Sequence, residues 1–231
     1  MGQYWKPVIE NSDGVRYSIE SHDFGNGLKI MEHSYIGNEL PSIIMYKIYN
    51  NPMHVTWVGD YTEDRKVGKE VEGPIGDDLW NDKNLIYFTN RSSLPDYMID
   101  LYNNEGDPRK TEEISDKELE HILSCFDKFS IQKYSLVNHT LKEYVDMAEY
   151  IKKPKASNSR LLNYHDTIIH PLPLLVAAPS MDEGLGDYHE DCATCFDKVC
   201  SWSWDMISVM NTEDVPKDFK KLDIYFDELK D

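Results

Sequence analysis

The apolar residues of this 231-residue chain occur in short runs, and none approaches the roughly 18 residues that a membrane-spanning helix requires. Segments rich in Gly, Pro, Asn and Asp separate these runs and favour turns. With 40% hydrophobic and 12% aromatic residues, the chain can still bury a sizeable core. The pattern therefore predicts a folded globular protein with no membrane partner.

Helix signals are clear in three places. Residues 37–52 offer Asn38 as an N-cap, and residues 93–104 carry a proline suited to a first turn. Ser115 and Glu118 form an S-x-x-E capping box before apolar residues at helical spacing. We therefore expect about three helices.

Strand signals are more numerous. Alternating, β-branched or aromatic runs predict strands at 16–21, 54–61, 201–210 and 221–229. A polar turn between two alternating runs predicts a hairpin within 132–150.

One further apolar run, 167–178, contains Pro171 and Pro173, which favour an edge strand or a bulge. Strict β-α-β alternation is absent. The whole pattern predicts a single compact α+β domain over 1–231, with an antiparallel-rich mixed sheet and surface loops at 62–85 and 179–201.

The net charge of −18 excludes most modes of direct nucleic-acid binding, because the phosphate backbone would be repelled. Residues 181–231 carry 14 Asp and Glu against five Lys. The N-terminal segment lacks a basic patch followed by an apolar stretch, so we expect no secretory signal and a cytoplasmic location. The acidic segment is typical of a solvated surface, although a protein that mimics nucleic acid would have a similar composition.

The segment DYHEDCATCFDKVCSW holds three of the four cysteines. Its His189, Cys192, Cys195 and Cys200 follow the spacing H-x2-C-x2-C-x4-C, and thiolate and imidazole are the ligands that zinc prefers. Four such ligands would close the coordination shell, so the ion would be structural rather than catalytic. A redox Cys192–Cys195 pair and simple unligated thiols are the alternatives.

Six segments together resemble a family of uncharacterised proteins from bacterial and bacteriophage genomes. They are NGLKIMEHSYIGN, VTWVGDYTED, YSLVNHTLKEYVDM, IHPLPLLVAA, GLGDYHED and SWSWDMISV, in that order over roughly 24–210. The resemblance implies no particular activity. Members of the family generally lack the cysteine cluster, so zinc would be a local addition in this chain.

The resemblance also implies a shared set of polar residues. These are His33, Asp60, Tyr61, Asn138, His139, His170, Asp187, Tyr188 and Asp205. If they met on one face, a ligand pocket would be the leading hypothesis. Considered one by one, each histidine is more typical of a structural residue with satisfied hydrogen bonds.

We therefore expect a protein that binds a small polar ligand, with a nucleotide-like compound as one option, or a partner protein. In a bacteriophage this would suit a counter-defence role. A hydrolase using Asp60, His139, His170 and Asp187 is one alternative, and an acidic nucleic-acid-mimic decoy is another.

Overall fold

The computed structural model describes residues 3–62, 74, 76–90, 92, 94, 109–153, 168–179, 184–185, 188–189 and 195–226. Within them, nine strands form one sheet in the order β11-β7-β6-β10-β3-β1-β2-β4-β5, and β8 pairs with β9 separately. The strands are β1 (Trp5–Glu10), β2 (Arg16–Ile19), β3 (Met53–Gly59), β4 (Ile86–Thr89), β5 (Lys110–Glu113), β6 (Tyr134–Asn138), β7 (Glu143–Asp146), β8 (Gly184–Leu185), β9 (Tyr188–His189), β10 (Met206–Asn211) and β11 (Lys220–Lys221).

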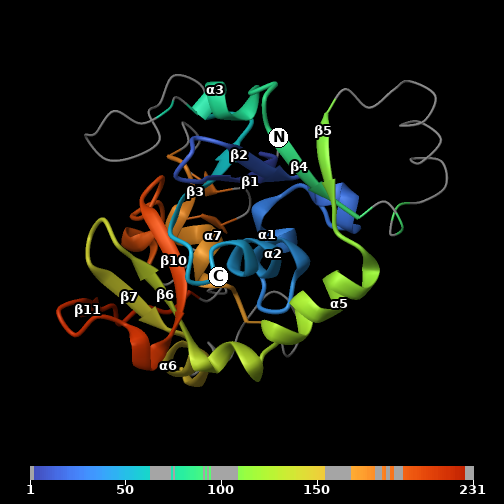
Figure 1. The fold of residues 1–231 in the computed structure, drawn as a ribbon. Coiled ribbons are helices and arrows are strands. Elements are labelled where there is room, and N and C mark those ends of the chain that lie inside the picture. The colour runs from blue at the N-terminus through green and yellow to red at the C-terminus, as the bar shows by residue number, and fades with distance from the viewer. Residues whose placement is uncertain are drawn as a thin grey trace.

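Six α-helices and four short 3-10 helices lie within the described residues. The α-helices are α1 (Ile30–His33), α2 (Glu39–Lys47), α3 (Gly76–Trp80), α5 (Asp116–Cys125), α6 (Met147–Lys152) and α7 (Pro171–Val176). The 3-10 helices are η1 (Ser21–Phe24), η3 (Ser130–Lys133), η5 (Phe196–Lys198) and η6 (Thr212–Asp214). Figure 1 shows α2 beside α1, with α5 next to α2 at the lower right. No helix in these ranges is both long and apolar enough to cross a membrane.

The α+β class is confirmed, but two finer expectations were wrong. The sheet is mixed rather than antiparallel-rich, because three of its eight strand pairs, β2–β4, β4–β5 and β7–β11, are parallel. The described residues contain six α-helices rather than about three, because short helices such as α1, α3 and α6 carry too few turns to show a periodic pattern.

The predicted strand or bulge in 167–178 is in fact helix α7, and this expectation was wrong. His170 is the N-cap, and its ring Nδ1 accepts a hydrogen bond from the Leu172 amide at 3.1 Å. Pro171 and Pro173 lie in the first turn, where an amide hydrogen has no partner inside the helix, so they do not disrupt it. The helix continues to Val176 and is buried throughout.

The other local signals agree with the structure to different degrees. Asn38 caps α2 and Ser115 caps α5, each by accepting a backbone amide hydrogen bond, as predicted. The hairpin is formed by β6 and β7, but α6 follows it directly. The strand expected at 221–229 is limited to Lys220–Lys221, and the helix expected at 93–104 lies outside the described residues.

The two faces of the sheet differ in chemistry. Side chains on neighbouring residues of a strand point to opposite faces. The first face carries Trp5, Ile9, Trp57 and Phe88, which join a large core cluster with α1, α2, α5, α6 and α7. The second face carries Lys6, Val8, Val58 and Tyr87 and packs against α3 and Trp204 in a smaller cluster.

Candidate functional site

The second face of the sheet holds a pocket of about 460 Å³ between α3 and the start of β4. Its lining residues come from the segment 80–87 and from Arg109, just before β5. They are Trp80, Asn81, Asp82, Lys83, Leu85, Tyr87 and Arg109. We refer to it as the Trp80–Tyr87 pocket.

Lys6 fixes both aromatic walls of this pocket. Its ammonium group donates to the Trp80 carbonyl at 2.8 Å and to the Tyr87 hydroxyl at 2.9 Å. The same nitrogen lies 4.7 Å from the Trp80 ring centroid and 5.3 Å from that of Tyr87, within the range of cation–π attraction. Only 5% of Lys6 is exposed. The two rings are therefore anchored from β1, the strand next to β2.

Removal of Lys6 from water lowers its pKa from 10.5 to about 8. Arg109 adds to this lowering, whereas Glu20 and Asp82 oppose it. Desolvation also raises the pKa of Glu20, although Lys6 and Arg109 pull it down. The cationic and anionic groups near the pocket thus stabilise one another at neutral pH.

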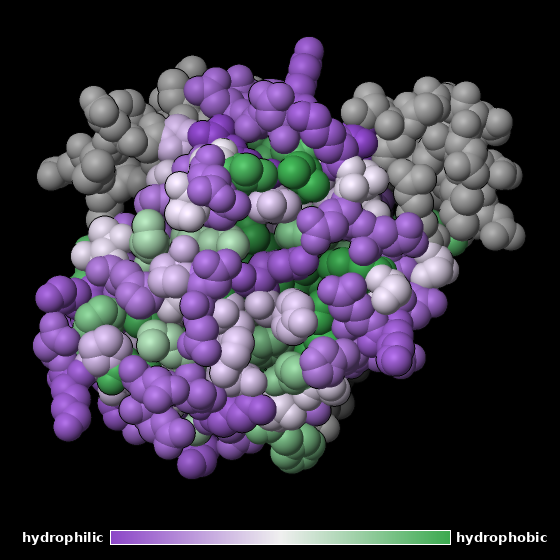
Figure 2. All heavy atoms as spheres, viewed as in Figure 1, coloured by the Kyte–Doolittle hydropathy of each residue, from purple (hydrophilic) through white to green (hydrophobic). Residues whose placement is uncertain are grey.

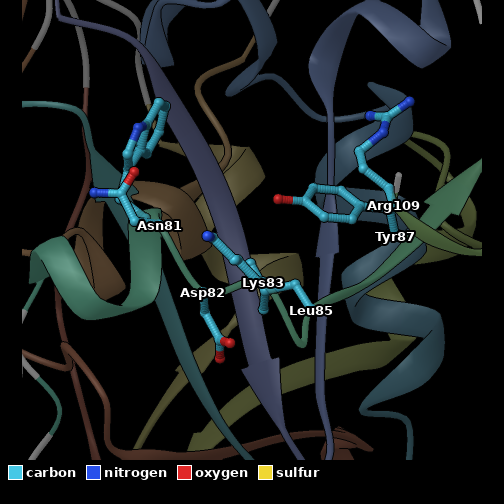
Figure 3. A pocket seen from close by; sticks show the side chains of 7 residues that line it. Asn81, Asp82, Lys83, Leu85, Tyr87 and Arg109 are labelled. Atoms are coloured by element: carbon cyan, nitrogen blue, oxygen red, sulfur yellow. The ribbon is translucent and has the colours of Figure 1, made fainter. Parts of the chain in front are cut away.

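Arg109 lies above the Tyr87 ring, with 5.1 Å from guanidinium carbon to centroid, and pairs with the buried Asp23 at 3.3 Å. Asp82 pairs with Arg16 at 3.2 Å and accepts the Asn84 amide at 2.8 Å. Figure 3 shows the Lys83 amine and the Tyr87 hydroxyl pointing into the pocket, while the Asp82 carboxylate points away from it. Its inward-facing polar groups are therefore chiefly donors.

The polar residues singled out from the sequence are distributed over several places. Asn138 donates to the Asp205 carboxylate at 2.8 Å, and the neighbouring His139 lies 2.7 Å from the Ser208 hydroxyl. Asp60 follows β3 and accepts the Tyr4 amide, whereas Asp205 precedes β10 at the other end of β3. Tyr61 follows Asp60 and is half-buried. Asp187 and the Tyr188 side chain lie outside the described residues.

His33 and His170 are core residues with both ring nitrogens bonded. His33 accepts from the Trp57 indole at 3.2 Å and contacts the Gly27 carbonyl, and burial lowers its pKa to about 4. His170 accepts from Leu172 and contacts the Met45 sulfur at 3.0 Å, and burial lowers its pKa to about 3. Both rings are neutral at pH 7, which suits a structural role.

The expected zinc ligands are only partly described. Cys195 and Cys200 are half-buried against the larger core cluster, and both have positive φ angles, 56° and 62°. The side chains of His189 and Cys192 lie outside the described residues. Among the side chains that are described, no group of three His, Cys, Asp or Glu could hold a metal ion. The zinc site stays a prediction.

No family model matches the sequence, and comparisons with curated proteins and with solved structures likewise give no match. The function must therefore come from the geometry of the site. None of the residues selected from the sequence lines the Trp80–Tyr87 pocket. Most of its lining lies in the segment 80–87, which matches no motif, and the supporting Lys6 is 81 positions from Tyr87.

Proposed function

We propose that this protein binds a small polar ligand in the Trp80–Tyr87 pocket. One observation carries the proposal: a cavity of about 460 Å³ has aromatic walls held from behind by a buried lysine. This combination of an apolar wall with a few convergent polar groups is typical of small-molecule sites, whose volumes run from about 300 to 1,000 Å³.

The pocket is preorganised, which supports binding. Tyr87 is only 8% exposed, and both Lys6 and Arg109 hold its ring. A site whose side chains are already fixed loses little conformational entropy when the ligand arrives. The favourable energy of the ligand contacts would then be offset little by the entropy cost of ordering the pocket walls.

Binding is favoured over hydrolysis as the general activity. The hydrolase alternative needs Asp60, His139 and His170 to meet around an open cleft. Asp60 and His139 lie at opposite ends of β3, and both ring nitrogens of His170 are bonded inside the core. Asp187, its fourth member, lies outside the described residues.

The partner-protein hypothesis has less to support it, whereas a counter-defence role is compatible with binding of a small ligand. Figure 2 shows a face covered mostly by hydrophilic side chains, with hydrophobic ones in small scattered groups. Large apolar patches are the usual mark of a docking surface, so this face favours a small ligand over a protein.

Denaturing the purified protein and identifying the released small molecules by mass spectrometry tests the proposal. We expect a compound released at near one equivalent by the natural chain and lost from Trp80→Leu and Tyr87→Leu. A matched change on the other side of the sheet, Tyr46→Leu on the exposed side of α2, should retain it. A compound retained equally by all of these chains would place the ligand elsewhere and contradict the proposal.

A further inference from the structure

The chemistry of the Trp80–Tyr87 pocket narrows its ligand to one class. We propose that the ligand is a planar aromatic anion of mononucleotide size, with its ring against Trp80 and Tyr87 and its anionic group at Lys83. This inference rests on the proposed function, because it assigns a ligand class to the same pocket.

The aromatic part of the ligand follows from the two walls. Trp80 and Tyr87 both line the cavity, and Lys6 holds each of them through a hydrogen bond and a ring contact. Rigid aromatic side chains in a pocket favour a flat ring over a flexible chain, because stacking needs a fixed plane. Base–aromatic stacking is also tolerant of the identity of the base.

The anionic part follows from the polar groups at the pocket. Lys83 is exposed and has no hydrogen-bond or ion-pair partner within the described part of the chain, and its amine points into the pocket. Arg109 also lines the cavity, but it pairs with the buried Asp23 and lies over the Tyr87 ring, so Lys83 provides the contact to the anion.

The one acid that lines the pocket does not oppose this assignment. Asp82 already pairs with Arg16 and accepts the Asn84 amide, so its carboxylate is satisfied inside the protein. Its carboxylate points away from the cavity. In a chain with a net charge of −18, the Lys83 amine gives this pocket a local positive charge.

The volume limits the size of the ligand. About 460 Å³ lies near the lower end of the range for small-molecule sites. It suits one ring with a sugar and a single phosphate-sized group. Longer polyanions would extend beyond the lining residues and be repelled by the net negative charge of the protein.

Four probes separate the two parts of the ligand: AMP has ring and anion, adenosine only the ring, ribose 5-phosphate an anion without the ring, and inorganic phosphate the anion alone. We expect AMP to bind about tenfold more tightly than adenosine, the gain typical of one charge-assisted contact, and more tightly still than both ring-free probes. Calorimetry at low and high salt measures this, and AMP affinity should fall with salt.

Variants assign each part to its residues. Lys83→Gln should weaken AMP about tenfold and leave adenosine unchanged, because only the anion contact is lost. Trp80→Leu should weaken AMP and adenosine by the same factor. Lys128→Gln removes an equally exposed lysine on a different part of the surface and should change neither. Lys83 is exposed, so its variant is expected to fold normally, which thermal unfolding verifies.

The failure of this inference can be told apart from failure of the proposed function. Equal affinities for AMP and adenosine, or equal affinities for AMP and ribose 5-phosphate, would overturn the ligand class while leaving a binding pocket. A neutral or cationic compound released on denaturation, in a Trp80-dependent way, would do the same. A released aromatic anion would support the class even if AMP itself binds weakly. If no probe binds and the purified protein releases no compound, both proposals fail.

Discussion

Burial has different effects on the two faces of the central sheet. On the first face, Trp5, Ile9 and Trp57 are at most 1% exposed and contact a large apolar cluster. On the second face, Lys6 is nearly as buried, yet it carries a charge and holds two aromatic rings at a pocket. Burial on the first face stabilises the fold, whereas burial on the second face costs solvation and positions a site.

The largest effect should come from truncating the first face. Trp57→Ala removes a fully buried ring and its hydrogen bond to His33, and should cost about 3–5 kcal/mol of unfolding free energy. Trp80→Ala removes a partly exposed ring of α3 beside the second face, and should cost less than half of that unfolding free energy. Urea unfolding of both variants measures the difference, and equal losses would remove the distinction between the faces.

Acid should destabilise the first-face core through its histidines. The unfolded pKa is about 6.5, and the folded values of His33 and His170 are about 4 and about 3. The unfolded chain therefore binds more protons, so stability is complete above about pH 6.5 and is lost as the pH falls toward the folded pKa values, by up to about 3 kcal/mol for His33 and about 5 kcal/mol for His170.

His170→Asn provides the control for this effect. Asparagine is a good N-cap residue, so the bond to the Leu172 amide can be kept while the titration is removed. The difference in urea midpoint between about pH 7 and pH 4 should shrink in this variant. An unchanged difference would mean that His170 is not buried as a neutral ring.

Alkali should have the opposite effect on the second face. The pKa of Lys6 is about 8 in the folded chain and 10.5 when unfolded, so the unfolded chain again binds more protons between these values. This residue should thus add up to about 3 kcal/mol of stability as the pH rises from about 8 to 10.5. Subtracting the pH profile of Lys6→Met from that of the natural chain isolates the gain, and parallel profiles would contradict it.

The smallest effect should come from the exposed start of helix α5. The Ser115 hydroxyl accepts the Glu118 amide at the start of α5. Ser115→Ala should cost about 1 kcal/mol, while Ser124→Ala, within the same helix, should cost a few tenths at most. Thermal unfolding of this pair checks that local effects are small beside those of the sheet.

Local chemistry explains which parts of the fold could be predicted. The caps at Asn38 and Ser115 depend on neighbouring residues, so the sequence showed them directly. Helix α7 was missed because its two prolines were interpreted as marking an edge strand or a bulge. His170 as the N-cap and Pro171 at the first helical position in fact favour a helix. The parallel pairs of β2 with β4 and of β4 with β5 depend on long-range contacts that no local pattern contains.

The pocket could not be predicted from the sequence for the same reason. Lys6, Trp80, Tyr87 and Arg109 come from β1, α3, β4 and the residue before β5. None of them belongs to a motif, and a lysine in a strand is usually solvated. Only the pairing of β1 with β2, and of β2 with β4, brings these side chains to one face.

The indole resonances of the five tryptophans provide the most direct test of the central claim, that the second face binds the ligand. In a nitrogen–proton correlation spectrum, Trp80→Phe identifies the Trp80 signal, and AMP is then added stepwise. We predict that the Trp80 indole signal moves saturably, while the signals of Trp5 and Trp57 on the first face stay in place. A Trp80 signal that does not move, while those of Trp5 and Trp57 do, would contradict the account.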